Sequence, residues 1–214
     1  MRWDHLFFDL DGTLTDPAEG ICGCIRYALE KDGRPTGPME EYFPWIGPPL
    51  EFSFREFAGA SDEDTPRLVA YYRERFSTIG WAENEVYEGI PALLEELRGR
   101  GVRMAIVSNK GDFAVKELAK LYFDGVIPIA VGARDGVPVK PARDLVDLAL
   151  RELDADLSRA VYIGDSEVDV VTARNADLPC ISLSWGFRSV ETLREAGADV
   201  ICDDIGALRR ALGL

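Results

Sequence analysis

The sequence has 214 residues, with 24 Lys and Arg against 38 Asp and Glu, so its formal net charge is −14 and its isoelectric point is near 4.5. Because 47% of the residues are hydrophobic and 29% are charged, the composition is that of a globular protein and excludes a disordered chain, a collagen and a small disulfide scaffold. The negative charge repels nucleic acid and anionic lipid, so we expect neither as a partner.

No apolar stretch approaches the ~20 residues that span a bilayer, and the first residues after Met1 are Arg2, Trp3, Asp4 and His5 and do not resemble a secretory signal. We therefore expect a cytoplasmic protein without a membrane anchor. Its cysteines are scattered and lie mostly in apolar runs, which predicts reduced core residues: Cys22, Cys24, Cys180 and Cys202.

Apolar runs of strand length recur along the chain and alternate with segments of helical periodicity. The predicted strands are 3–10, 102–108, 160–163 and 180–185, with 198–202 weaker. The predicted helices between them are 91–100, 112–122, 141–153 and 167–175. This alternation predicts an α/β fold, a Rossmann-like parallel sheet with helices on both faces.

The region after the first strand breaks the alternation and contains no convincing strand pattern. Helices are expected at 20–31, 50–59 and 61–79, with a loop rich in Pro and aromatic residues at 34–49. We therefore expect a small helical domain at 16–87, inserted into a core made of 1–15 and 88–214.

Acidic residues follow the first predicted strand in the motif Asp9-Leu10-Asp11-Gly12. Ligands of open parallel sheets bind beyond the carboxyl ends of the strands, so both carboxylates should lie at a binding crevice. Two carboxylates this close repel each other unless a cation or a shared proton lies between them. Taken alone, the motif is more typical of a solvated turn than of a binding site.

A second acidic motif, Gly164-Asp165-Ser166-Glu167-Val168-Asp169, follows another predicted strand. Its carboxylates should emerge at the same sheet edge and form an oxygen-rich site suited to Mg²⁺, although Asp165 or Ser166 would also cap the following helix. Two further strand ends carry Ser108 and Lys140, a hydroxyl donor and a positive charge suited to phosphoryl oxygens.

The ordered motifs DLDGTLTD at 9–16, VSN at 107–109, VKP at 139–141 and GDSEVD at 164–169 resemble the four motifs of the haloacid dehalogenase-like hydrolases. The resemblance covers nearly the whole chain, and the helical insertion is similar to the C1-type cap domain of that family. It implies an enzyme, a phosphoric monoester hydrolase.

Carried over residue by residue, the resemblance implies that Asp9 is the nucleophile that forms an aspartyl-phosphate. Asp11 would act as general acid toward the leaving oxygen and then as the base for water. Ser108 would donate a hydrogen bond to the phosphoryl group, and Lys140 would offset the negative charge around it.

The implied cofactor is Mg²⁺, held by Asp9, Asp165 and the main-chain carbonyl of Asp11. Asp169 would contact it through water or orient another group. Mg²⁺ and Lys140 together supply three positive charges, which explains how an acidic protein accepts an anionic substrate. The remaining motif residues are expected to contact substrate: Gly12, Thr13 and Asn109.

Asp11 favours phosphate chemistry, since the dehalogenases of the family lack this second acid. The chain looks most like the phosphoglycolate phosphatase branch, through the first motif, the segment 46–50 and Trp185-Gly186-Phe187. We therefore predict a phosphatase for a small phosphorylated metabolite, working as a monomer or homodimer. Tyr42, Trp45 and Arg55 of the cap are predicted to contact the leaving group, although aromatic residues in a small helical cap more often form its core.

Other activities remain open at this point. A sugar-phosphate mutase or a 5'-nucleotidase of the same superfamily shares the core motifs. Outside the enzymes, a regulatory module that accepts a phosphoryl group uses similar residues, but it lacks the inserted cap and has no use for Asp11.

Overall fold

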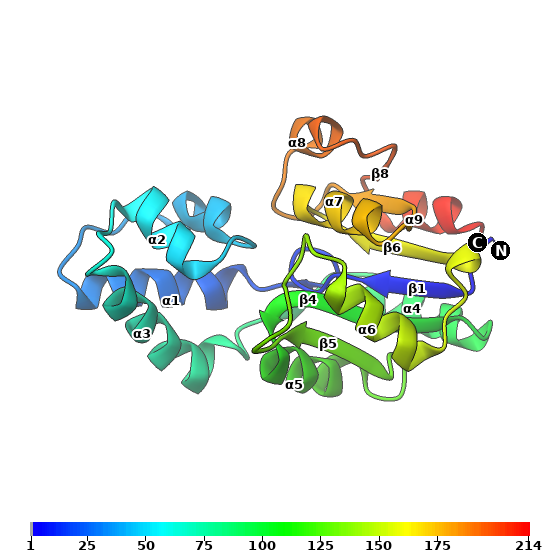
Figure 1. The fold of residues 1–214 in the computed structure, drawn as a ribbon, viewed down its shortest axis with the longest axis horizontal. Coiled ribbons are helices and arrows are strands. Elements are labelled where there is room, and N and C mark those ends of the chain that lie inside the picture. Colours follow the sequence, from blue (N-terminus) through cyan, green and yellow to red (C-terminus); the bar gives the residue numbers. More distant parts are fainter. Residues whose placement is uncertain (1) are drawn as a thin grey trace. The chain divides into compact units, whose positions relative to one another are not determined.

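The computed structural model describes residues 2–214, which form two compact units (Figure 1). Unit 1 consists of the segment up to Thr15 together with Val86–Leu214, and unit 2 is Asp16–Glu85. Two short strands, β2 (Thr15–Asp16) and β3 (Glu85–Val86), pair with each other where the chain passes between the units. Strands of two residues carry no periodic pattern, so they cannot be predicted from the sequence.

Unit 1 is built on a six-stranded sheet with the order β5-β4-β1-β6-β7-β8. Every pair of neighbouring strands is parallel. The strands are β1 His5–Phe8, β4 Arg103–Gly111, β5 Ile129–Ala133, β6 Ala160–Gly164, β7 Cys180–Leu183 and β8 Val200–Cys202.

Helices follow the strands and cover the sheet. In Figure 1, α6 and α7 lie in front of the sheet, and α4 and α9 lie behind it. The helices of unit 1 are α4 Ile90–Gly99, α5 Asp112–Phe123, α6 Asp144–Leu153, α7 Glu167–Asn175, α8 Val190–Glu195 and α9 Ile205–Leu212, with a short 3₁₀ turn, η3, at Leu157–Arg159.

The central strand β1 is buried along its whole length because it lies between β4 and β6 and is covered on both faces. Phe7 belongs to a core cluster with Tyr162 of β6 and with Leu145 and Ala149 of α6. A strand buried on both faces is mostly apolar, and this accounts for the run of Leu6, Phe7 and Phe8; His5, at the start of the strand, is buried as well.

Unit 2 is helical and consists of α1 Ala18–Lys31, a 3₁₀ segment η1 Met39–Trp45, α2 Leu50–Ala58, α3 Thr65–Arg75 and a π-helical turn η2 Phe76–Gly80. Its core contains Ile25 of α1, Phe54 of α2 and Leu68 of α3, all fully buried.

The predicted helix 61–79 begins later than expected. Ser61 Oγ accepts a hydrogen bond from the Asp64 amide (3.1 Å), but in a turn that precedes the helix.

Strand β5 and helices α8 and α9 were not among the predicted elements. β5 is an edge strand of five residues that is only partly buried, follows Pro128 and contains Gly132, so its apolar pattern is weak.

Helix α6 begins at Asp144, three residues after the predicted start at Pro141. Residues 140–143 instead form a turn.

Among the described residues, no helix combines the length and the apolar composition needed to cross a membrane. All four cysteines are free thiols, and Cys22, Cys24 and Cys202 are buried.

The position of Phe7 leads to a stability prediction. Its side chain is fully buried in the central strand, so Phe7→Ala leaves a cavity under α6 and should lower the free energy of unfolding by about 3–5 kcal/mol. Urea unfolding followed by circular dichroism measures this change. The matched control is Phe113→Ala, since Phe113 is 74% exposed and its truncation should cost little. Equal losses in the two variants would contradict this account of the core.

Candidate active site

Three neighbouring strands, β4, β1 and β6, carry polar residues at the same edge of the sheet. Asp9 follows β1 directly, Asp165 follows β6 directly, and Ser108 lies near the end of β4. All three side chains are buried. Because the strands are parallel and adjacent, their carboxyl ends bring together residues that are far apart in the sequence.

A buried ammonium joins two of the predicted acids. Lys140 Nζ lies 2.9 Å from Asp9 Oδ1 and 2.8 Å from Asp169 Oδ1. The Lys140 side chain is 3% exposed and that of Asp169 is fully buried. Lys140 and Asp169 are both screened from solvent, so the charge of each is compensated by neighbouring groups and not by water.

Two neighbours fix Lys140 in place. Asn109 accepts a hydrogen bond from the Lys140 amide (2.7 Å) and donates one from Nδ2 to the Lys140 carbonyl (2.9 Å). The phenol oxygen of Tyr162 accepts from Lys140 Nζ (3.1 Å) and donates to the carbonyl of Val107 (3.1 Å). The side chain of Asn109, predicted to contact substrate, therefore holds the lysine segment.

Asp169 is fixed by the start of α7. Its Oδ2 accepts hydrogen bonds from the amide (3.0 Å) and hydroxyl (2.6 Å) of Ser166, whose Oγ in turn accepts from the Asp169 amide (3.3 Å). This is a capping box, in which the two side chains satisfy the free amides of the first helical turn. With Lys140 on its other oxygen, Asp169 is suited to orient the lysine.

Asp165 is enclosed by main chain. Its Oδ1 accepts from the Thr13 hydroxyl (3.1 Å), and its Oδ2 accepts from the Phe187 amide (3.0 Å). A Cβ atom at Gly12 or at Gly186 would lie within 2.3 Å of an Asp165 carboxylate oxygen, and Gly12 also has a positive φ of +86°. The two glycines therefore make room for this carboxylate, and the hydroxyl of Thr13 points at it.

Burial changes the acidity of these groups. It raises the pKa of Asp9 to about 7, with Lys140 opposing the rise and Asp169 adding to it. It raises the pKa of Asp165 to about 8, with the charges of Asp169 and Asp9 adding to the effect. Burial alone would lower the pKa of Lys140, but the two carboxylates beside it raise the pKa well above its ordinary value.

The acidic cluster suits a divalent cation. Asp9, Asp165 and Asp169 each offer a carboxylate oxygen, and these atoms lie within 4.8 Å of one another. Lys140 is the ammonium paired with Asp9 and Asp169, and one positive charge does not balance three carboxylates. Hard carboxylate oxygens are the ligands that Mg²⁺ prefers, so the donor set fits this ion.

The second acid of the first motif has a separate partner. Asp11 accepts hydrogen bonds from Lys110 Nζ on both carboxylate oxygens, at 2.9 Å each. Ser108 accepts a bond from the Lys110 amide (3.2 Å), and its side chain is buried beside this pair on β4. Each aspartate of the D-x-D motif therefore has a lysine partner, Lys140 for Asp9 and Lys110 for Asp11.

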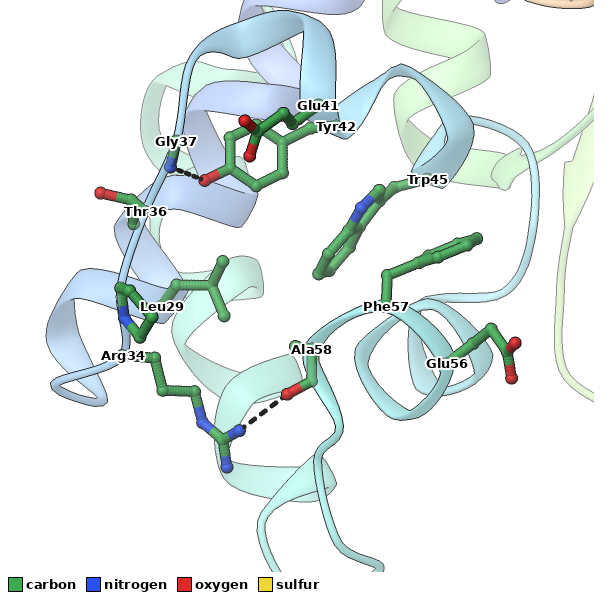
Figure 2. A pocket seen from close by; sticks show the side chains of 11 residues that line it. Leu29, Arg34, Thr36, Gly37, Glu41, Tyr42, Trp45, Glu56, Phe57 and Ala58 are labelled. Atoms are coloured by element: carbon green, nitrogen blue, oxygen red, sulfur yellow. Dashed lines mark hydrogen bonds between the residues drawn. The ribbon is translucent and has the colours of Figure 1, made fainter.

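The predicted residues of unit 2 lie in or near its aromatic core. Tyr42 and Trp45 are buried, lie edge to face with ring centres 5.7 Å apart, and line a cavity of about 700 Å³ within the unit (Figure 2). The Tyr42 hydroxyl accepts from the Gly37 amide at 2.8 Å. Arg55 is not among the residues that line this cavity; it is half exposed and pairs with Asp62 (3.0 Å).

Neither Tyr162 nor Lys110 is among the site residues predicted from the sequence. Tyr162 lies inside the apolar run of β6, where a tyrosine is compatible with simple core packing. Its position three residues before Asp165 is the one available signal. The partner of Lys110 depends on how β4 and the loop after β1 approach each other, which no local pattern encodes.

The candidate site is thus a cluster of buried carboxylates with a paired lysine at the carboxyl edge of a parallel α/β sheet, the edge at which enzymes of this class bind their ligands. The chain belongs to the haloacid dehalogenase-like hydrolase family, whose model matches residues 6–183. The predicted family, the α/β fold class and the enzyme class, a hydrolase, are thereby confirmed.

The chain is also similar to individual proteins with different names. The chain is 34% identical over 214 residues to a 5'-nucleotidase of Pseudomonas aeruginosa, covering 99% of this chain and 96% of that protein. It is 30% identical over 212 residues to tyrosine-protein kinase PtkA of Mycobacterium tuberculosis, covering 98% of this chain and 72% of that one. A crystal structure described as a predicted phosphatase from Clostridium acetobutylicum matches with a TM-score of 0.90 and 33% identity over 99% of both chains. Other relatives are named phosphoglycolate phosphatase and pyrophosphatase.

The raised pKa values predict how stability depends on pH in the absence of metal. In the unfolded chain Asp9 and Asp165 have the ordinary pKa of 3.8, so at pH 6.5 both are ionised there. The folded protein still holds most of these protons at that pH and releases them as the pH passes about 7 for Asp9 and about 8 for Asp165. The folded state therefore binds more protons, and the free energy of unfolding falls as the pH rises toward about 8.

The measurement is urea unfolding in EDTA at several pH values between about 6.5 and 8. This range lies above the ordinary pKa of 6.5 of His5, whose burial acts in the opposite direction. Asp165→Asn, which does not titrate, should show a shallower decline than the wild-type protein. A wild-type stability that rises over this range would contradict the prediction.

Proposed function

We propose that this protein is a Mg²⁺-dependent phosphatase that hydrolyses a small phosphorylated metabolite, phosphoglycolate or a related phosphomonoester, through an aspartyl-phosphate intermediate. The observation that carries the proposal is the contact between Asp9, at the end of the central strand, and the buried ammonium of Lys140 at 2.9 Å. A carboxylate held against a fixed positive charge at a ligand-binding sheet edge is suited to attack an anionic phosphoryl group.

In the first step, an oxygen of Asp9 attacks phosphorus and forms the new P–O bond. The bond between phosphorus and the leaving oxygen breaks, and its electron pair stays on that oxygen. Asp11 donates a proton to the same oxygen. In the second step Asp11 removes a proton from water, the water oxygen attacks phosphorus, and Asp9 leaves as a carboxylate. Inorganic phosphate and the free enzyme result.

Other residues stabilise the charge that builds up during these steps. The Ser108 hydroxyl would donate to a phosphoryl oxygen, and Lys140 would offset the charge shared by Asp9 and the substrate. Mg²⁺, held by Asp9, Asp165 and the main-chain carbonyl of Asp11, would neutralise phosphoryl oxygens that otherwise repel Asp9. Asp169 and Tyr162 would keep the Lys140 ammonium in place.

The first test measures phosphate release from p-nitrophenyl phosphate, phosphoglycolate, a nucleoside 5'-monophosphate, a sugar phosphate and pyrophosphate. Activity should require Mg²⁺, disappear in EDTA and fall at least ~10³-fold in Asp9→Asn, because the nucleophile is lost. Asp135→Asn, an exposed acid of the same unit, is the matched control and should retain wild-type rates.

Substantial turnover by Asp9→Asn would refute the nucleophile assignment. If the nucleoside 5'-monophosphate is hydrolysed fastest, the proposed substrate becomes a nucleotide, in line with the name of the Pseudomonas relative, a 5'-nucleotidase. Isomerisation of the sugar phosphate without release of phosphate would indicate a mutase.

The contacts from unit 2 form a separate part of the proposal, in which Tyr42, Trp45 and Arg55 recognise the leaving group. Arg55 is the best residue to test, because its ion pair with Asp62 is exposed and its loss should hardly affect stability. Arg55→Gln should raise KM for phosphoglycolate several-fold, since an anionic leaving group loses a cation, while KM for p-nitrophenyl phosphate stays unchanged. Arg73→Gln, another exposed arginine of the unit, is the control. Unchanged KM values in Arg55→Gln would remove Arg55 from the site.

A further inference from the structure

The active site holds two lysines, and the mechanism above uses only one. Lys140 contacts Asp9 and Asp169, whereas Lys110 contacts Asp11 through both carboxylate oxygens at 2.9 Å. The side chain of Lys110 is 7% exposed and that of Asp11 is 16% exposed. A pair this sheltered holds its geometry far better than an ion pair on the surface.

The local structure of β4 supports the placement of Lys110. The register between β4 and β5 is irregular between Val107 and Gly111, and the Lys110 amide bonds the hydroxyl of Ser108 within this irregular stretch. A shift of register, like a β-bulge, changes the direction of the side chains in the strand. Lys110 is therefore anchored by its main chain at the residue predicted to bind phosphate and by its side chain at Asp11.

We propose that Lys110 is the positioning residue for Asp11, the general acid and base of the phosphatase reaction. This inference rests on the proposed function. When one Asp11 oxygen carries the proton destined for the leaving group, the other oxygen can still accept a hydrogen bond from the Lys110 ammonium. The contact thus holds the carboxyl group while the protonated oxygen faces the leaving oxygen. Proton transfer is efficient only when donor and acceptor are held at hydrogen-bond distance.

The consequence depends on the leaving group. An alkoxide leaves only with a proton, so hydrolysis of phosphoglycolate needs a correctly placed Asp11. The p-nitrophenolate ion is stable and leaves without one. Loss of Lys110 should therefore harm the first substrate more than the second, which a purely structural role of the lysine would not produce.

The experiment compares kcat/KM for phosphoglycolate, or another alkyl phosphate that the wild-type enzyme accepts, with kcat/KM for p-nitrophenyl phosphate. For each substrate, kcat/KM reports the steps up to phosphoryl transfer to Asp9. It does not include the later hydrolysis of the aspartyl-phosphate. Lys110→Met should lower the alkyl phosphate value about 10–100-fold and the p-nitrophenyl phosphate value less than about 3-fold. Lys110→Arg, which keeps a cation able to grip both oxygens, should restore most of the loss.

Two controls complete the design. Lys116→Met removes an exposed ion pair of the same type, with Asp112 at 2.7 Å, and should change neither value. In an Asp11→Asn background, Lys110→Met should add no further selective loss, because the group that it positions is already gone.

Equal losses on both substrates, or no loss on either, would overturn the role of Lys110 while leaving an Asp9-dependent phosphatase intact. If the wild-type protein shows no Asp9-dependent hydrolysis of any substrate, the proposed function fails and the role of Lys110 fails with it. The two failures are therefore distinguishable.

Discussion

The candidate active site depends on one interaction, the pairing of the buried Lys140 ammonium with the carboxylates of Asp9 and Asp169. Removing one partner from such a group typically costs about 3–5 kcal/mol, because a charge is left without compensation inside the protein. The surroundings of Lys140 reflect this cost. Asn109 bonds both main-chain groups of the lysine, and Tyr162 supplies a third contact to the ammonium.

These contacts draw on several parts of unit 1. Asp9 comes from the end of β1, Asn109 from β4, Tyr162 from β6 and Asp169 from α7. The parallel sheet brings the strand ends together, and the buried lysine then requires each of them to hold a particular place. Fold and site are therefore linked by electrostatic compensation as well as by apolar packing.

The sequence predicted the parts of this arrangement that depend on local pattern. Helix α7 was expected at 167–175, with Asp165 or Ser166 as its cap, and it spans Glu167–Asn175 with Ser166 as the cap. The acids and the lysine were found because they follow strands or belong to recognisable motifs. Strand β5 was missed, since an edge strand of five partly buried residues beside Pro128 has little periodicity.

Contacts between residues that are far apart in the sequence could not be predicted from it. Nothing near Lys110 indicates that its partner is Asp11, 99 residues away. Likewise, Asn109 was expected to face substrate, whereas its side chain bonds the main chain of Lys140. Both outcomes depend on how separate loops meet at the sheet edge, which hydrophobic periodicity does not describe.

The capping box at the start of α7 has one further consequence. Asp169 satisfies the amide of Ser166 and binds Lys140 with its other oxygen, so the first turn of α7 cannot fray without disturbing the contact between Asp169 and the buried ammonium. Helix ends are ordinarily the first places where a protein opens locally, and their amides exchange rapidly with solvent. Here the end of a helix is tied to the charge balance of the site. Hydrogen exchange at Ser166 and Asp169 should therefore be slow for a helix terminus and should report directly on the integrity of the lysine contact.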